Sequence, residues 1–257
     1  MVAAALIALA LPVALCIYLH KRGANLNAFL VGALVMLLSA FVLESIAHQL
    51  ILSTFVGSVI QANPWLYAIY GGLMAGLFEE TGRLLAFKKF LKKYQDNDIN
   101  AIMYGAGHGG LEAMVVLGMA TINNIVWSSM INSGNTAALL GDLTGAQLAE
   151  AERSIDALIH YPSYLFLLGG VERVFAIAIQ IALSVMVWFA AKKKDKWYLY
   201  TQAILLHLFV DASTVILSSY GVSTILLEVV VGVLAVVCVL LAKMIYKRNH
   251  VPEEEVA

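Results

Sequence analysis

Ionisable side chains interrupt three apolar stretches of the sequence: Glu79, Glu80 and Arg83 in the first, His108 and Glu112 in the second, and His207 and Asp211 in the third. A carboxylate beside an imidazole in a partly dry cavity can take a proton from water as a general base. A polar group across the cavity can stabilise the oxyanion of a tetrahedral intermediate. Amide hydrolysis needs both functions. Ser213 and Cys238 have no matching base, so the residue types favour direct attack by water over an acyl-enzyme.

Helical spacing suggests how these side chains are paired. Glu79 and Arg83 are four residues apart and share a helix face, and we expect Arg83 to hold one carboxylate ionised or in orientation. Glu80 points about 100° away from Glu79 and must serve a different role. Two further pairs have the same four-residue spacing: His108 with Glu112, and His207 with Asp211. Four glycines leave room around His108 for close helix packing or a substrate backbone: Gly105, Gly107, Gly109 and Gly110.

Five more ionisable residues lie in apolar stretches. Glu172 and Arg173 are adjacent and project differently, so we expect each to pair with residues of other helices. Glu44, His48 and Glu228 fall in the outer halves of their stretches, which favours structural networks or gating over catalysis.

The composition indicates that these residues belong to a membrane protein. Of 257 residues, 61 % are hydrophobic and 13 % are charged, whereas soluble domains are nearer half apolar and a quarter charged. The composition excludes an ordinary soluble enzyme, a disordered chain and a nucleic-acid binder with a basic face. The two cysteines, Cys16 and Cys238, form neither a disulfide framework nor a spaced metal motif.

The hydropathy pattern predicts an all-α, polytopic membrane protein: a single domain over residues 1–257 with about seven transmembrane helices. The expected spans are Val2–Leu19, Leu26–Leu52, Trp65–Phe87, Ile99–Thr121, Tyr161–Ala191, Trp197–Ser218 and Val222–Ile245. Residues 122–160 form the long outer loop, in which Thr144 to Gln147 resembles a capping box and an amphipathic helix continues to Ile159. We expect Glu253–Glu255 to belong to a disordered end.

The basic residues indicate the orientation. If the seven spans alternate, thirteen of the sixteen basic residues fall on one side: Lys21, Arg22, Lys88, Lys89, Lys92, Lys93, Lys192, Lys193, Lys194, Lys196, Lys243, Lys247 and Arg248. This asymmetry predicts a multi-pass protein of the cell membrane with its C-terminus in the cytoplasm and its N-terminus outside.

The orientation places three polar residues at one depth. Glu79, His108 and His207 each lie roughly nine or ten residues from the cytoplasmic edge, which is about 13–16 Å at the rise of an α-helix. Charged groups that persist in hydrocarbon usually face an interior cavity and mark function. We therefore expect these three side chains to form one site.

These motifs, in this order, resemble the CAAX-protease and bacteriocin-processing superfamily of glutamic intramembrane proteases. The Glu79-Glu80-x-x-Arg83 spacing, the run from Gly107 to Glu112 and the Glu172-Arg173 pair are similar to its YhfC-like branch. The resemblance covers about Gly71 to Ser218.

The resemblance implies a role for each matched residue. Glu79 would activate water, His108 would bind or orient that water, and Glu80 and Arg83 would support the geometry of the acid. His207 and Asp211 would form the oxyanion-side pair. Supporting positions are Glu112, Glu172, Arg173 and Gln180. Two positions depart from the pattern: Asp211 stands where the superfamily commonly has Asn, and Gln180 where the YhfC-like pattern often has His. Asp211 cannot donate a hydrogen bond unless protonated and would orient His207 instead.

The resulting hypothesis is a glutamic-type endopeptidase that cuts membrane-associated peptides or proteins near the cytoplasmic face. Its partners would be that substrate and the lipid bilayer, with no nucleic acid. No cofactor is expected. A zinc site built from His108, His207 and nearby carboxylates is conceivable, but no His-Glu-x-x-His pair lies on one helix. Two alternatives remain: a proton-coupled transporter that uses the same residues, and a non-catalytic peptide-binding or immunity protein.

Overall fold

The computed structural model describes residues 1–250, and no β-strand occurs in that range. The α-helices are α1 (Val2–Lys21), α2 (Leu26–Met36), α3 (Ser45–Leu52), α4 (Phe55–Ala62), α5 (Pro64–Leu85), α6 (Ile99–Ala113), α7 (Ala120–Asn132), α8 (Thr136–Leu140), α9 (Gly145–His160), α10 (Ser163–Lys192), α11 (Tyr198–Ser219) and α12 (Thr224–Asn249). The acidic end at Glu253–Glu255 lies outside the described residues.

Short π-helical segments continue two of these helices instead of ending them. Leu37–Glu44 joins α2 to α3, and Met114–Met119 joins α6 to α7. Such π-helical insertions occur frequently at functional sites. Here one ends at Glu44 and the other begins two residues after Glu112, and both glutamates line the cavity described below.

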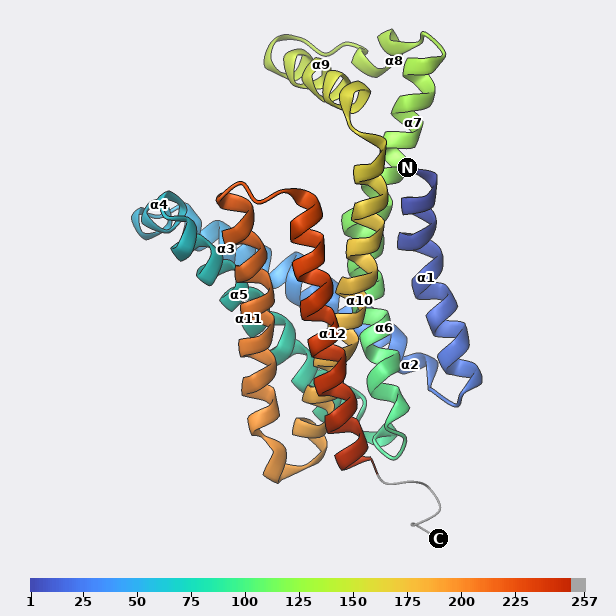
Figure 1. The fold of residues 1–257 in the computed structure, drawn as a ribbon, viewed down its shortest axis with the longest axis vertical. Helices are drawn as coiled ribbons and strands as arrows, with labels where there is room; N and C mark the ends of the chain where they lie inside the picture. Colours follow the sequence, from blue (N-terminus) through green and yellow to red (C-terminus); the bar gives the residue numbers. More distant parts are fainter. Residues whose placement is uncertain (251–257) are drawn as a thin grey trace.

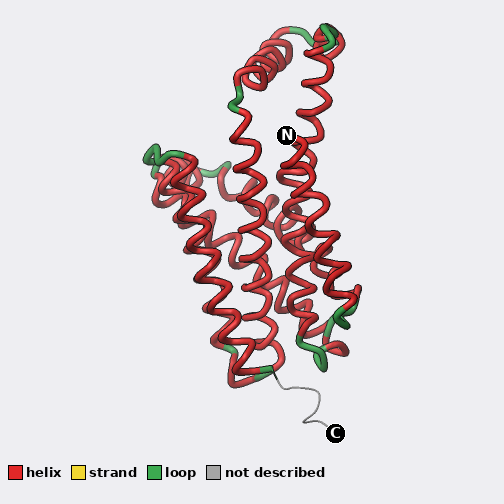
Figure 2. Tube along the Cα trace, turned by 45° about the vertical axis from the view of Figure 1, so that its right-hand side comes forward, coloured by secondary structure: helices red, strands yellow, loops and turns green. Residues whose placement is uncertain are grey.

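The all-α membrane class is confirmed. Among the described residues, six helical segments are long and apolar enough to cross a membrane: Val2–Lys21, Leu26–Leu52, Ile99–Asn132, Ser163–Lys192, Lys194–Ser219 and Thr224–Asn249. The remaining expected span corresponds to α5, which has 22 residues. It lies outside this set because Glu79, Glu80 and Arg83 lower its apolarity. Figure 1 shows α5 packed within the bundle beside α11, and Figure 2 shows the loops gathered at the ends of the helices.

The expected outer loop is mostly helical. The helix that begins at Ile99 runs on to Asn132, because apolar residues such as Ile122, Val126 and Ile131 continue past its expected end. The short α8 and the amphipathic α9 follow, and these elements project beyond the rest of the bundle (Figure 1). The expected helix is therefore present. The capping box is not, because the Thr144 side chain makes no capping hydrogen bond.

Close backbone contacts position the helices around α6. A Cβ atom on Gly107 would lie 2.0 Å from the backbone oxygen of Phe29, and one on Gly32 would lie 2.2 Å from that of Tyr104. The α2 and α6 backbones therefore touch, which only glycine permits at these positions. The other three glycines expected to allow close packing do so as well: Gly105 and Gly109 against α10, and Gly110 against α1.

Candidate active site

A cavity of about 400 Å³ opens among the helices that carry the ionisable residues. Its polar wall consists of Glu44, Ser45, His48, Glu79, Glu112, Glu172, Arg173, Gln180, His207, Asp211 and Thr214. These residues come from the long helix Leu26–Leu52, from α5, α6, α10 and α11. Five helical segments thus contribute polar side chains to one cavity.

Glu79, on α5, contacts side chains of α6 and α10. Its Oε2 atom lies 2.9 Å from Nε2 of His108 and accepts a second hydrogen bond, 3.0 Å long, from Nε2 of Gln180. Glu79 lines the cavity, whereas His108 is fully buried and stands behind it. The Nδ1 atom of His108 has no partner among the described residues, and its ring stacks on Tyr104 with centroids 5.8 Å apart. His108 therefore positions Glu79 from behind the cavity wall.

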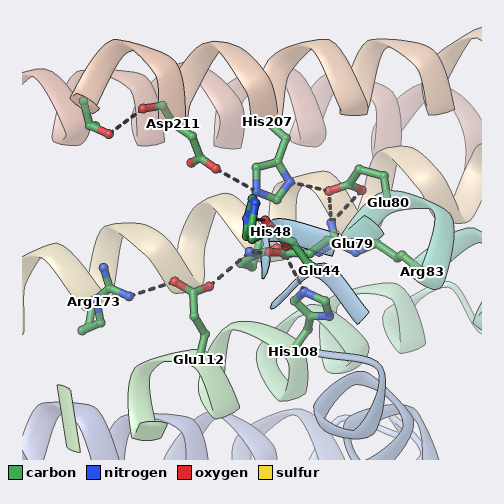
Figure 3. A network of polar contacts seen from close by, with 12 residues as sticks. Glu44, His48, Glu79, Glu80, Arg83, His108, Glu112, Arg173, His207 and Asp211 are labelled. Atoms are coloured by element: carbon green, nitrogen blue, oxygen red, sulfur yellow. Dashed lines mark hydrogen bonds and ion pairs between the residues drawn. The ribbon is translucent and has the colours of Figure 1, made fainter. Parts of the chain in front are cut away.

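Glu80 anchors a second set of contacts. Both of its oxygens accept from Nη1 of Arg83, at 3.0 and 3.1 Å, and Glu80 and Arg83 are completely buried. Oε1 also lies 2.9 Å from Nδ1 of His207. The other ring nitrogen of His207, Nε2, is 3.5 Å from Oδ2 of Asp211. His207 is thus held between two carboxylates (Figure 3).

Gln180 connects the two sets. Its Oε1 accepts from Nη2 of Arg83 at 2.5 Å, and its Nε2 donates to Glu79 at 3.0 Å and to Glu112 at 3.1 Å. Glu112 in turn accepts from Arg173 at 2.8 Å, and Arg173 also bonds Glu172. The neutral side chain at 180 lets one residue accept from an arginine and donate to two carboxylates, which a carboxylate at that position could not do.

The structure brings every residue of the expected site into one network. His207 approaches Asp211 as its spacing suggested, but the other expected pairs differ. Arg83 contacts Glu80 and Gln180 and makes no described hydrogen bond to Glu79. His108 contacts Glu79 across the helix interface in place of Glu112 on its own helix. Same-face spacing only permits a contact, and side chains from neighbouring helices approach these groups more closely.

Glu44 and His48 extend the polar wall beyond the expected site, and Tyr70 contacts His48 there. Nε2 of His48 lies 3.1 Å from Glu44, and Nδ1 lies 2.9 Å from the hydroxyl of Tyr70. We expected Glu44 and His48 to form a structural or gating network apart from catalysis; the structure places both in the wall of the same cavity. No signal in the sequence distinguished Tyr70 from an ordinary lipid-facing aromatic residue.

The donor types at the cavity suit a divalent metal ion. Zinc takes histidine nitrogen and carboxylate oxygen at about 2.0–2.2 Å, so two such ligands at a tetrahedral angle lie roughly 3.3 Å apart. His207 Nε2 and Asp211 Oδ2 are 3.5 Å apart. The opposite nitrogen of His207 contacts the Glu80 carboxylate, which is the usual support for a metal-binding histidine. Within residues 1–250, no three His, Cys, Asp or Glu side chains are grouped as a complete metal-binding set.

Comparisons with known proteins identify relatives of the chain. Residues 7–235 match the family model described as "YhfC intramembrane metalloprotease". The chain is also 39 % identical, over 214 residues, to a Bacillus subtilis (strain 168) protein described as "Uncharacterized membrane protein YhfC"; the alignment covers 82 % of this chain and 81 % of that protein. No solved structure matches the chain.

The family description corrects the predicted chemistry. The glutamic-type reaction is wrong, because the family is described as a metalloprotease. The description supports a peptidase in general, and it is consistent with a metal such as zinc, which was kept open from the sequence without being favoured. It does not bear on membership of the wider CAAX-protease superfamily. Since the family model matches most of the chain and the relative aligns over four fifths of it, this chain belongs to the YhfC family of membrane proteins.

Proposed function

We propose that this chain is a metal-dependent intramembrane peptidase that hydrolyses peptide bonds of membrane-associated substrates. The observation that carries the proposal is the convergence of Glu79, His207 and Asp211, from two helices, on one cavity backed by the buried His108 and Glu80. Burying such groups in hydrocarbon is costly, and they persist where they serve a function. The family description gives independent support.

Glu79 is the proton acceptor in this proposal. Both of its described hydrogen bonds are made through Oε2, so Oε1 remains available to take a proton from water. His108 and Gln180 hold the carboxylate from two other helices and limit its rotation. A base fixed in this way contributes about 10²–10⁴-fold to a hydrolytic rate.

His207 and Asp211 are the side chains that would hold the metal ion. When bound, a metal supplies Lewis-acid polarisation of a peptide carbonyl and acidifies water. Glu80 orients His207 through Nδ1 and so directs Nε2 toward Asp211. Arg83 compensates the charge of Glu80 in a place that water does not reach.

The test combines turnover with metal analysis of purified full-length protein in detergent. Cleavage of a quenched fluorescent peptide panel is measured for the wild type, Glu79→Gln, His207→Ala, Asp211→Asn and a surface control, Glu150→Gln, on α9. Bound metal is counted by inductively coupled plasma mass spectrometry in the same samples.

We expect Glu79→Gln to lose at least 100-fold in turnover while retaining its metal. His207→Ala and Asp211→Asn should lose both, and Glu150→Gln should match the wild type. Full cleavage by Glu79→Gln would overturn the proposal. Cleavage at full rate by wild-type protein that contains no metal would show that the reaction does not depend on a metal ion. Solute uptake driven by a proton gradient, or peptide binding without turnover, would favour a transporter or a binding protein instead.

A further inference from the structure

We propose that the cavity admits substrate from the end of the bundle opposite the lysine-rich loops, which carry Lys88–Lys93 and Lys192–Lys196. The substrate would then be a peptide segment on the non-cytoplasmic side. This proposal deepens the proposed function and rests on it. It differs from the cytoplasm-proximal cleavage expected from sequence, because depth along the helices does not reveal which side of the site is closed.

The cavity extends in one direction from the site. On α11 its wall continues from His207 through Asp211 to Thr214, toward the end of the helix at Ser219. On α10 it continues from Gln180 to Glu172, toward the start of the helix at Ser163. Both directions lead away from the lysine-rich loops and toward the end from which α9 projects (Figure 1).

The long helix Leu26–Leu52 shows the same direction. Its residues at the cavity run from Met36 through Glu44 to His48, near the end of the helix farthest from Lys21 and Arg22. Three helices thus place the cavity on the same side of Glu79.

An aromatic layer closes the opposite side. Tyr104, Phe87 and Trp188 are completely buried. The ring of Phe87 contacts both of the others, with centroids 4.5 Å from Tyr104 and 5.0 Å from Trp188. Tyr104 stacks on His108, so the layer begins directly behind the site. None of the three aromatic residues lines the cavity.

Asp98 fastens this closed end. Its carboxylate is 1 % exposed; it accepts from Nε1 of Trp188 at 2.8 Å and from Nζ of Lys192 at 2.6 Å, and it lies 3.0 Å from Nδ1 of His250. One carboxylate at the start of α6 therefore ties together the ends of α10 and α12. Hydrogen bonds to a charged group are among the strong ones, so this end is not poised to open.

The open side has the chemistry that an extended peptide requires. An unfolded backbone at membrane depth must find hydrogen-bond partners in the protein. The outward wall offers the carboxylates of Glu44 and Glu172, which contact His48 and Arg173 respectively. Apolar residues such as Phe41 line the same cavity. Since the lysine-rich end faces the cytoplasm under the positive-inside rule, the open side faces outward.

The test measures which side of the membrane reaches the cavity and requires no catalysis. In a Cys16→Ser, Cys238→Ser background, the reporters are Thr214→Cys and Ala176→Cys, two cavity positions outside the proposed catalytic set. Gln147→Cys on α9 and Lys194→Cys beside α11 mark the two ends. A membrane-impermeant cationic thiol reagent is added to intact cells and to inverted vesicles, and labelling after denaturation confirms that each thiol is free.

We expect Thr214→Cys and Ala176→Cys to react at least tenfold faster in the preparation that labels Gln147→Cys than in the one that labels Lys194→Cys. Faster reaction from the Lys194→Cys side would overturn the proposal, and so would reaction from neither side. Because labelling is read without turnover, an inactive protein with outward labelling would refute the peptidase and leave the direction of access standing.

Discussion

The buried Glu80–Arg83 pair should dominate the stability of the site. Glu80 and Arg83 are three residues apart on α5, have no exposed surface and meet at 3.0 Å. Replacing Arg83 by Met keeps most of its apolar stem and leaves Glu80 with His207 as its remaining described partner. Breaking one side of a buried ion pair costs about 3–5 kcal/mol, because an uncompensated charge stays buried.

The double variant should recover much of that loss. In Glu80→Gln, Arg83→Met both charges are absent, and replacing both partners of a buried pair is often nearly neutral. The double-mutant cycle should therefore report a coupling of about 3 kcal/mol or more, since the double variant costs much less than the sum of the two single variants. A matched control exists on α9, where Glu150 and Arg153 have the same three-residue spacing but side chains 68 % and 70 % exposed. Exposed pairs couple by only about 0.2–1 kcal/mol.

The assay is reversible unfolding of detergent-solubilised protein with SDS, followed by far-UV circular dichroism, for all members of both cycles. A coupling at Glu80–Arg83 that equals the coupling at Glu150–Arg153 would refute the reasoning, since burial would then make no difference. A double variant less stable than Arg83→Met alone would refute it as well.

Three further predictions test other contacts. Gln180→Leu should lower turnover about 10–100-fold, as loss of a residue that orients the site typically does, and unchanged peptide cleavage would contradict its linking role. Gly107→Ala should lower the free energy of unfolding by about 1–3 kcal/mol through overpacking against Phe29. The control Gly71→Ala, whose Cβ would meet nothing within 4 Å, should be neutral or stabilising. Equal changes in the free energy of unfolding for the two variants would contradict the contact. Asp98→Asn should weaken three charge-assisted contacts and lower the free energy of unfolding by about 1.5–3 kcal/mol with little change in turnover, whereas an unchanged unfolding curve would show that the carboxylate does not fasten that end.

The family description shows how far residue types alone could identify the reaction. Acid–base chemistry at a carboxylate and imidazoles is common to peptidases with and without a metal. Glu79, His108 and His207 therefore indicated hydrolysis, but they gave no sound ground for preferring the glutamic type to a metal-dependent one. The four-residue spacing predicted the approach of His207 to Asp211, which is 3.5 Å. The contact of Glu80 with the other nitrogen of His207 joins two helices, and no spacing could predict it.

The sequence by itself determined the membrane class, the position of most helices and the identity of the ionisable residues. These are local properties, read from apolar length and from residue type. Only the tertiary structure decided which side chains pair and which side of the site is closed. The deciding contacts join residues far apart in the chain, 29 positions for Glu79 with His108, 101 for Glu79 with Gln180 and 127 for Glu80 with His207. Such contacts depend on how each helix is rotated against its neighbours, and that rotation is determined by packing between helices and not by spacing within one.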